Sequence, residues 1–357
     1  MNHISSEGLV PIVCTDRRAG AFKTHHALVQ ITAPFHQAVP EYTVVVLLDD
    51  LPLFTRTWYY SALSYPMLND RLSTTFMLRN PDGTSPSQEL SLSLQRRLLL
   101  PFEQVKGLYH LDIIGYAAEV EKDLKRRMAK PLPTLVDCCE KAQGFMEAGD
   151  AAIISNNLQE ALELYRQAFH SIHILIHGRT RRVLADVFFH EAIETGRFAG
   201  QTGMTVRLVM RLKLVSRYVL AYLKLEQWAE AAFWGMRSIR IMRESMDTEF
   251  EDFLSEFVGG EDVAMIYVRT GIAFTKMEED PHGPWELDLK AYDGEHVAGS
   301  ESIFGIAKKY LKKRDRSSVR KELEGFGVGK FRIEYFGDEN IKTEAMSTSG
   351  QKGSETE

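Results

Sequence analysis

Two helical runs joined by a pair of asparagines lie near the middle of the chain and constrain its fold. The stretch 148–168 carries small residues on both runs, with one aromatic residue among them: Gly149, Ala161, Tyr165 and Ala168. Small side chains let two helices approach closely, and an aromatic ring fills the gap beside them. Asn156 and Asn157 supply the turn. The stretch therefore predicts a closely packed helical hairpin.

This stretch resembles a tetratricopeptide repeat. With Gly149 at position eight of the repeat, Ala161 falls at position twenty, Tyr165 at twenty-four and Ala168 at twenty-seven, as in the family pattern. The resemblance implies paired helices that stack into a solenoid with a concave surface for a peptide or helix of a partner.

Residues 218–231 and 267–277 resemble two further, more divergent repeats. Tyr222 falls at position eleven and Ala231 at position twenty of the second, and Gly271 falls at position eight of the third. Gly149 and its equivalent Val219 lie 70 positions apart, about two periods of roughly 34 residues. We therefore predict an all-α, TPR-like helical-hairpin solenoid over residues 134–323. An ordinary helical bundle with coincidental alanines is the alternative.

The region before it, residues 1–130, is predicted to be a small α+β module. Alternating or β-branched runs at 27–32, 42–48, 72–78 and 109–114 indicate strands. Residues 87–105, bent at Pro101, and 117–128 indicate helices. Pro131-Leu132-Pro133 marks the expected boundary. Residues 337–357 are polar, and we expect a disordered tail.

Composition and charge indicate which partners and which cellular compartment to expect. A net charge of −6 gives no general attraction to nucleic acid or to an acidic membrane. With three cysteines and no Cys-x-x-Cys pair, structural disulfides are not expected. Neither a signal peptide nor a run of about eighteen apolar residues is evident. We therefore expect a cytoplasmic or nuclear protein without membrane contact.

Charge along the predicted helical region is divided into two blocks. Residues 203–243 hold eight Lys or Arg and two Glu, whereas residues 244–288 hold thirteen acids. We predict that Arg207, Lys213 and Arg217 line a groove for an acidic peptide; helices that neutralise each other are the alternative.

The family's clamp for a carboxylate tail gives a more specific test of the ligand. It requires lysine and asparagine where this chain has Met146, Asp150 and Arg217, and only Arg269 matches. Because Asp150 would repel a carboxylate, a receptor for such tails is disfavoured. Arg269 stays among the predicted partner contacts.

Catalytic and metal-binding motifs are not evident. His170, His173 and His177 share a face if they lie on one helix, but they would then span about 10 Å, too far for one ion. The His-Glu pair at 190–191 lacks a second histidine, and no phosphate loop, dinucleotide fingerprint or nucleophile elbow occurs. We expect no metal, cofactor, nucleic acid or small-molecule substrate. The stretch Lys308–Lys321 holds eight basic residues and is either an import signal or a solvated helix.

These patterns favour a non-catalytic adaptor or scaffold that binds a protein partner. The competing hypothesis is an enzyme of unrecognised class with its active site in the N-terminal module or between modules.

Overall fold

The computed structural model describes residues 13–14, 24–35, 42–65, 67–79, 90–245, 260–279, 303–305, 307–308, 311 and 316–328. The chain divides into two compact units. The N-terminal unit comprises Met1–Cys138 and His173–Met204, and the helical unit comprises Cys139–Ile172 and Thr205–Glu357. This division is discontinuous, whereas the sequence suggested a single boundary at Pro131-Leu132-Pro133. The predicted tail, residues 337–357, lies outside the described residues.

The N-terminal unit contains a five-stranded sheet with the order β1-β3-β2-β4-β5. The strands are β1 (Val13–Cys14), β2 (His26–Thr32), β3 (Tyr42–Leu47), β4 (Ser73–Met77) and β5 (His110–Ile114). β4 and β5 are parallel and the other neighbours are antiparallel. A parallel pair needs a crossover, and the segment between β4 and β5 supplies it. The predicted positions of β2 to β5 are confirmed to within a residue or two.

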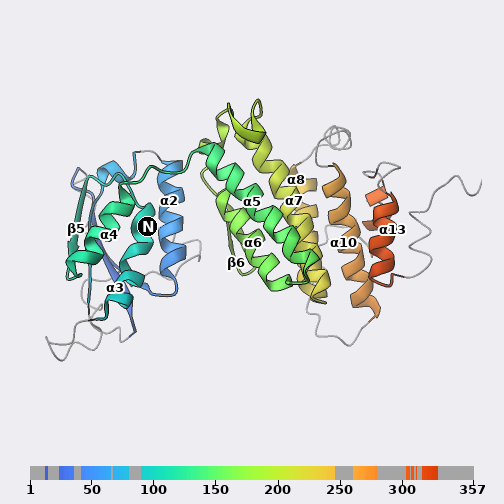
Figure 1. Cartoon of the computed structure of the whole chain (residues 1–357), viewed down its shortest axis with the longest axis horizontal. Coiled ribbons are helices and arrows are strands. Elements are labelled where there is room, and N and C mark those ends of the chain that lie inside the picture. Colours follow the sequence, from blue (N-terminus) through green and yellow to red (C-terminus); the bar gives the residue numbers. More distant parts are fainter. Residues whose placement is uncertain are drawn as a thin grey trace, which may run out of the picture. The chain divides into compact units, whose positions relative to one another are not determined.

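Helices pack against the sheet through one hydrophobic core. They are α2 (Leu51–Ser64), α3 (Leu92–Leu99) with the 3-10 turn η3 (Leu100–Gln104), and α4 (Ala118–Met128) (Figure 1). Val29, Val44 and Phe76 of the sheet meet Phe54 and Trp58 of α2, Phe102 of η3 and Leu124 of α4 in this core. Pro101 lies in the turn that follows α3, so the predicted bend is confirmed.

Helix α2 is absent from the sequence prediction. Its run of Thr, Trp and Tyr favours a strand by propensity, and seven of its residues are buried. Pro52 in the first turn is a helix-start signal. Burial on the sheet therefore outweighs the local preference of these side chains.

The helical unit is built from long helices that follow one another along the unit in Figure 1. They are α5 (Leu135–Ile154), α6 (Leu158–Ser171), α7 (Gly203–Lys224), α8 (Trp228–Ser245), α10 (Gly260–Glu279) and α13 (Arg316–Gly325); α5 and α7 begin within the N-terminal unit. A sheet region followed by mostly helical structure is thus confirmed. Within the described segments, no helix is both long enough and apolar enough to cross a membrane.

The turns that end α5 and α7 have the same geometry, 70 positions apart. Asn156 and Glu226 both adopt positive φ, 60° and 58°. The amide of Asn157 donates to the carbonyl of Ala152, and the amide of Gln227 donates to that of Tyr222. This is the Schellman arrangement, in which one left-handed residue closes the helix. The offset equals the spacing between the first two predicted repeats.

Replacing Glu226 with glycine is expected to stabilise the helical unit by about 1 kcal/mol, because a non-glycine residue in the left-handed region is strained. Urea unfolding followed by circular dichroism measures the change. Glu226→Ala keeps the Cβ atom and should leave the midpoint where it is. If glycine and alanine behave alike, the turn carries no such strain.

A β-hairpin interrupts the region that was predicted to be all-α, and that prediction is wrong here. β6 (Ile174–His177) pairs with β7 (Thr180–Val183), and 3-10 turns at Asp186–His190 and Gly196–Phe198 follow. Leu175 of β6 joins the core of the N-terminal unit. The isoleucines at 172, 174 and 176 before Gly178 are a hairpin signal, but the preceding helical periodicity hid it.

Candidate functional site

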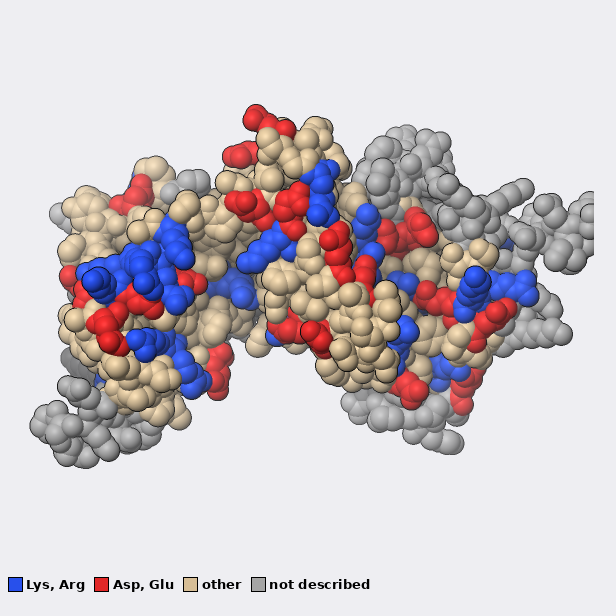
Figure 2. Space-filling model, in the orientation of Figure 1, with Lys and Arg blue, Asp and Glu red and all other residues tan. Residues whose placement is uncertain are grey.

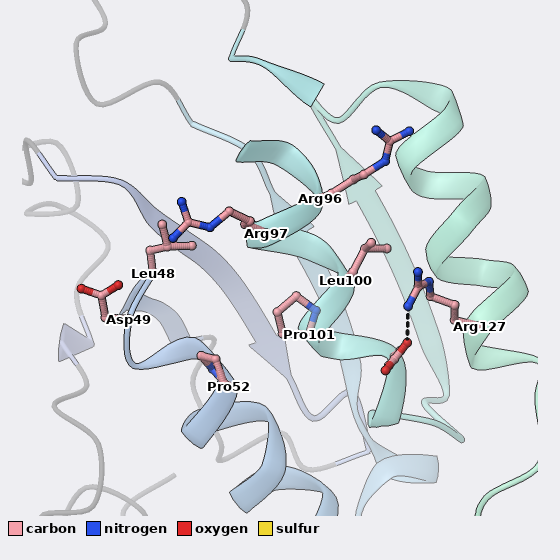
Figure 3. Close-up of a pocket in the computed structure, with 9 residues that line it drawn as sticks. Leu48, Asp49, Pro52, Arg96, Arg97, Leu100, Pro101 and Arg127 are labelled. Carbon is pink, nitrogen blue, oxygen red and sulfur yellow. Dashed lines mark hydrogen bonds and ion pairs between the residues drawn. The ribbon is translucent and has the colours of Figure 1, made fainter. Parts of the chain in front are cut away.

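A pocket of about 580 Å³ lies in the N-terminal unit, where three segments of the chain converge (Figure 3). The β3–α2 junction contributes Leu48, Asp49 and Pro52, α3 and η3 contribute Arg96, Arg97, Leu100, Pro101 and Glu103, and α4 contributes Arg127. Pro52 and Pro101 lie where α2 and η3 begin. Their rings and the two leucines form an apolar lining bordered by three arginines.

Two of the pocket arginines are paired with acids. The Arg127 Nη1 atom lies 3.0 Å from Glu103 Oε2, and its Nε atom lies 3.3 Å from Asp123 Oδ1. Hydrogen bonds with Glu103 and Asp123 raise the pKa of Arg127, so its charge is retained. Arg96 pairs with Glu119 at 2.7 Å. These contacts fix both guanidinium groups at the edge of the pocket.

Arg97 differs from its two neighbours. Among the residues that the structure describes, it has no hydrogen-bond or ion-pair partner. It is exposed, and Figure 3 shows its guanidinium group extended toward Leu48 at the pocket edge. An arginine provides five donors in a planar fork that matches a carboxylate or phosphate. Within the described part of the chain, nothing occupies the fork of Arg97.

The pocket opens onto a basic surface. Figure 2 shows Lys and Arg side chains gathered over α3 and α4, with acidic side chains among them. Lys125 pairs with Glu121, and Arg126 pairs with Asp123, within α4. Burial opposes ionisation of Asp123, but hydrogen bonds from Arg127 and Arg126 outweigh it and lower its pKa. This surface combines fixed ion pairs with Arg97, which has no partner among the described residues.

The predicted partner-binding residues occupy different surroundings from those expected. Arg207 is 3% exposed and donates from Nε to the carbonyl of Ile172 at 3.0 Å. Arg217 Nε lies 2.8 and 2.9 Å from the two carboxylate oxygens of Asp150. Its Nη1 atom lies 3.5 Å from Asp262. Arg207 and Arg217 are thus engaged within the helical unit, and their predicted contact with a partner stays a prediction.

Arg269 and Lys213 belong to the same set of internal contacts. Arg269 forms a two-pronged ion pair with Glu322 of α13, at 2.6 and 3.0 Å. Its Nη1 atom also donates to the backbone and side-chain oxygens of Ser216, both at 2.7 Å. Lys213 is half-buried, and its charge acts on Asp262. Burial raises the pKa of Asp262, while the charges of Arg217 and Lys213 oppose that rise.

These contacts form a polar network that connects the helices. The Tyr165 hydroxyl of α6 donates to Asp150 of α5 at 2.8 Å, and Asp150 accepts from Arg217 of α7. Burial and this hydrogen bond raise the pKa of Tyr165, so the phenol stays protonated. These contacts tie α5, α6 and α7 to one another, as the alternative of mutually neutralising helices would require.

The small residues named from the sequence lie between helices. Ala161, Ala168 and Ala231 are fully buried. A Cβ atom at Gly149 would lie 2.4 Å from the Tyr165 ring, and one at Gly271 would lie 2.6 Å from Phe304. Tyr222 is half-buried, and its ring centroid lies 5.2 Å from that of Tyr218.

Gly235 marks another close approach between helices. A Cβ atom there would lie 2.0 Å from Thr270 Oγ1, so α8 and α10 meet at this glycine. Counted from Val219 as Tyr165 is counted from Gly149, Gly235 falls at position twenty-four of the second repeat. A glycine in mid-helix is the signal that was available.

The three histidines considered from the sequence do not share a helix face. Helix α6 ends at Ser171, His173 lies in a turn with φ 55°, and His177 ends β6. His173 is buried, with Nε2 3.8 Å from Cys138 Sγ and its ring 4.6 Å from that of Tyr60. The described parts of the chain contain no group of three or more His, Cys, Asp or Glu placed to hold a metal ion.

Within the basic stretch Lys308–Lys321, the structure describes Lys308, Leu311 and residues 316–321. Arg320 pairs with Glu324 at 3.0 Å on the exposed side of α13. The import signal stays a prediction. Comparison of the chain with models of protein families, with curated proteins and with solved structures finds no match.

Proposed function

We propose that the protein is a non-catalytic interaction protein whose N-terminal pocket binds an acidic segment of a partner protein. The observation that carries this proposal is Arg97, an exposed cation without an intramolecular partner among the described residues, beside an apolar lining. A partner carboxylate would pair with Arg97, and an apolar side chain next to it would cover Leu100 and Pro101. Interfaces commonly combine such an arginine with a small apolar core.

The chemistry of the lining supports binding rather than catalysis. Its nine residues include no serine, cysteine, histidine or lysine. Of the two carboxylates, Glu103 is held by Arg127 at 3.0 Å. A general base needs a free carboxylate or imidazole within reach of the substrate. Asp49 is the lining carboxylate without a partner among the described residues, but the lining supplies no imidazole, thiol or hydroxyl beside it to complete a catalytic set.

For the helical unit we propose a diverged tetratricopeptide-like array that serves as a scaffold. The repeated turn geometry at Asn156 and Glu226 and the close contact of Gly149 with Tyr165 support this proposal. Arg217 and Arg269 form ion pairs with Asp150 and Glu322 inside this unit. The proposed partner contact therefore lies in the N-terminal pocket.

Charge reversal at Arg97 tests the proposed function. Partners captured from cell extract by the full chain are identified, purified and titrated against wild-type protein and Arg97→Glu. We expect Arg97→Glu to weaken binding at least tenfold, about 1.4 kcal/mol, because a repulsion replaces an attraction.

Arg71→Glu provides the matched control. Arg71 is also an exposed arginine of the N-terminal unit, but it lies outside the pocket. This variant changes the net charge equally and should bind like the wild type. Equal affinity of all three proteins would rule out the pocket as the binding site.

A further inference from the structure

Asp49 lines the same pocket as Arg97, and it too has no hydrogen-bond or ion-pair partner among the described residues. Asp49 is exposed, and the two side chains do not pair with each other. Figure 3 shows Asp49 and the Arg97 guanidinium group beside Leu48, at the opposite end of the lining from Arg127. The pocket thus presents an anion and a cation to solvent at one end.

The remaining charges of the lining are matched within the fold. Arg127 pairs with Glu103 and Asp123, and Arg96 pairs with Glu119. Among the described side chains of the lining, the two unpaired charges are therefore one of each sign. A ligand gains most from this end of the pocket if it supplies one charge of each sign in return.

Both unpaired charges stand on backbone that is fixed before a ligand arrives. Asp49 follows β3 in a turn that is closed by a hydrogen bond from the Asp50 amide to the Leu47 carbonyl, at 3.1 Å. Arg97 lies on α3, which Leu99 anchors in the core of the N-terminal unit. Such preorganisation lowers the cost of ordering the site when it binds.

We propose that the pocket recognises a segment with charges of both signs, in which an acidic side chain pairs with Arg97 and a basic side chain pairs with Asp49. This inference rests on the proposed function and narrows the class of partner segment. In an extended segment, residues two positions apart point to the same side and lie about 7 Å apart. An acid and a base at that spacing reach two different side chains of the pocket, and an apolar neighbour covers Leu100 and Pro101.

The two unpaired charges also give selectivity. A segment with two acids gains the contact with Arg97, but it brings its second carboxylate toward Asp49, where like charges repel. A segment with two bases gains the contact with Asp49 and is repelled by Arg97. Interfaces reject wrong partners by such like-charge contacts. A segment with one acid and one base avoids both repulsions.

Selection from a display library of random heptapeptides tests the proposal on the full chain. We expect the wild-type protein to enrich peptides that combine an acidic, a basic and an apolar residue. Asp49→Lys should instead enrich peptides with two acids, because both unpaired charges of the pocket are then positive. Arg97→Glu should enrich peptides with two bases for the converse reason.

A peptide selected by the wild type is then synthesised and titrated by calorimetry. Asp49→Lys should bind it at least tenfold more weakly, and replacing the basic residue of the peptide with glutamate should restore most of that loss. A misfolded variant would bind neither peptide, so restored affinity identifies the charge pair. Asp70→Lys is the matched control: Asp70 is an exposed acid of the N-terminal unit outside the pocket, and this variant should bind like the wild type.

The outcomes separate this inference from the proposed function. Weaker binding by Arg97→Glu with unchanged binding by Asp49→Lys overturns the inference and leaves the acidic contact in place. A loss in Asp49→Lys that the glutamate peptide does not restore also overturns the inference. Unchanged binding by both variants, or enrichment of no peptide by the wild type, overturns the proposed function as well.

Discussion

Replacing Arg269 with alanine is expected to lower the free energy of unfolding of the helical unit by about 3–5 kcal/mol. The Arg269 and Glu322 side chains are only 11% and 18% exposed, and they join at 2.6 Å. Alanine would leave the Glu322 carboxylate partly buried without its partner, and it would remove both bonds to Ser216. Helix α13 would lose its main polar tie to α10.

Hydrogen–deuterium exchange on the full chain measures this effect helix by helix, so the two units need not unfold together. We expect faster exchange in α10 and α13 and unchanged exchange in the N-terminal sheet. Arg320→Ala breaks the exposed ion pair between Arg320 and Glu324 within α13, whose side chains are 53% and 48% exposed. This control should lower the free energy of unfolding by no more than about 0.5 kcal/mol. Similar losses for the two variants would contradict a buried, structural role for Arg269.

Gly149→Leu is expected to destabilise the first hairpin by about 3 kcal/mol, near the upper end of what overpacking costs. Even a Cβ atom at this position would lie 2.4 Å from the Tyr165 ring. The ring is fully buried, and its hydroxyl is tied to Asp150 at 2.8 Å. It therefore has no room to rotate away, and the leucine must push α5 and α6 apart.

Gly144, on the same helix, provides a direct comparison. A Cβ atom there meets no other atom within 4 Å. Gly144→Ala should raise stability by up to about 1 kcal/mol, since alanine is the better helix former. The double variant Gly149→Leu with Tyr165→Ala should lose less stability than the sum of the two single variants. Without the Tyr165 ring, the leucine has space between the helices. If Gly149→Leu unfolds at the same urea concentration as the wild type, the close contact between Gly149 and Tyr165 does not hold the hairpin together.

Local patterns were enough to locate most elements of the fold. The alternation at 27–32 and 72–78 marked β2 and β4, and the paired asparagines marked the turn between α5 and α6. The sequence did not predict helix α2 or the β6–β7 hairpin, because in both segments the local preference of the residues disagrees with their tertiary environment. The Thr, Trp and Tyr residues of α2 favour strands but are helical where they cover the sheet. Residues 174–183 follow directly on a helical pattern but form a hairpin, whose Leu175 enters the N-terminal core.

The candidate pocket was not predictable in the same way. Its residues come from positions near 50, 100 and 127, and no short motif unites them. The adjacent arginines at 96 and 97 were visible as charges, but their roles differ. Both line the pocket, but Arg96 pairs with Glu119, 23 positions away, whereas Arg97 has no partner among the described residues.

The sequence by itself determined where most helices, strands and turns form, because side-chain periodicity and turn residues act over a few neighbouring positions. It also indicated which small residues allow helices to pack closely. Only the tertiary structure decided which of the described charges are partners of one another. Arg217 meets Asp150 across 67 positions, and Arg269 meets Glu322 across 53. The physical reason is that an ion pair depends on distance and burial in space, and these are set by how distant helices pack.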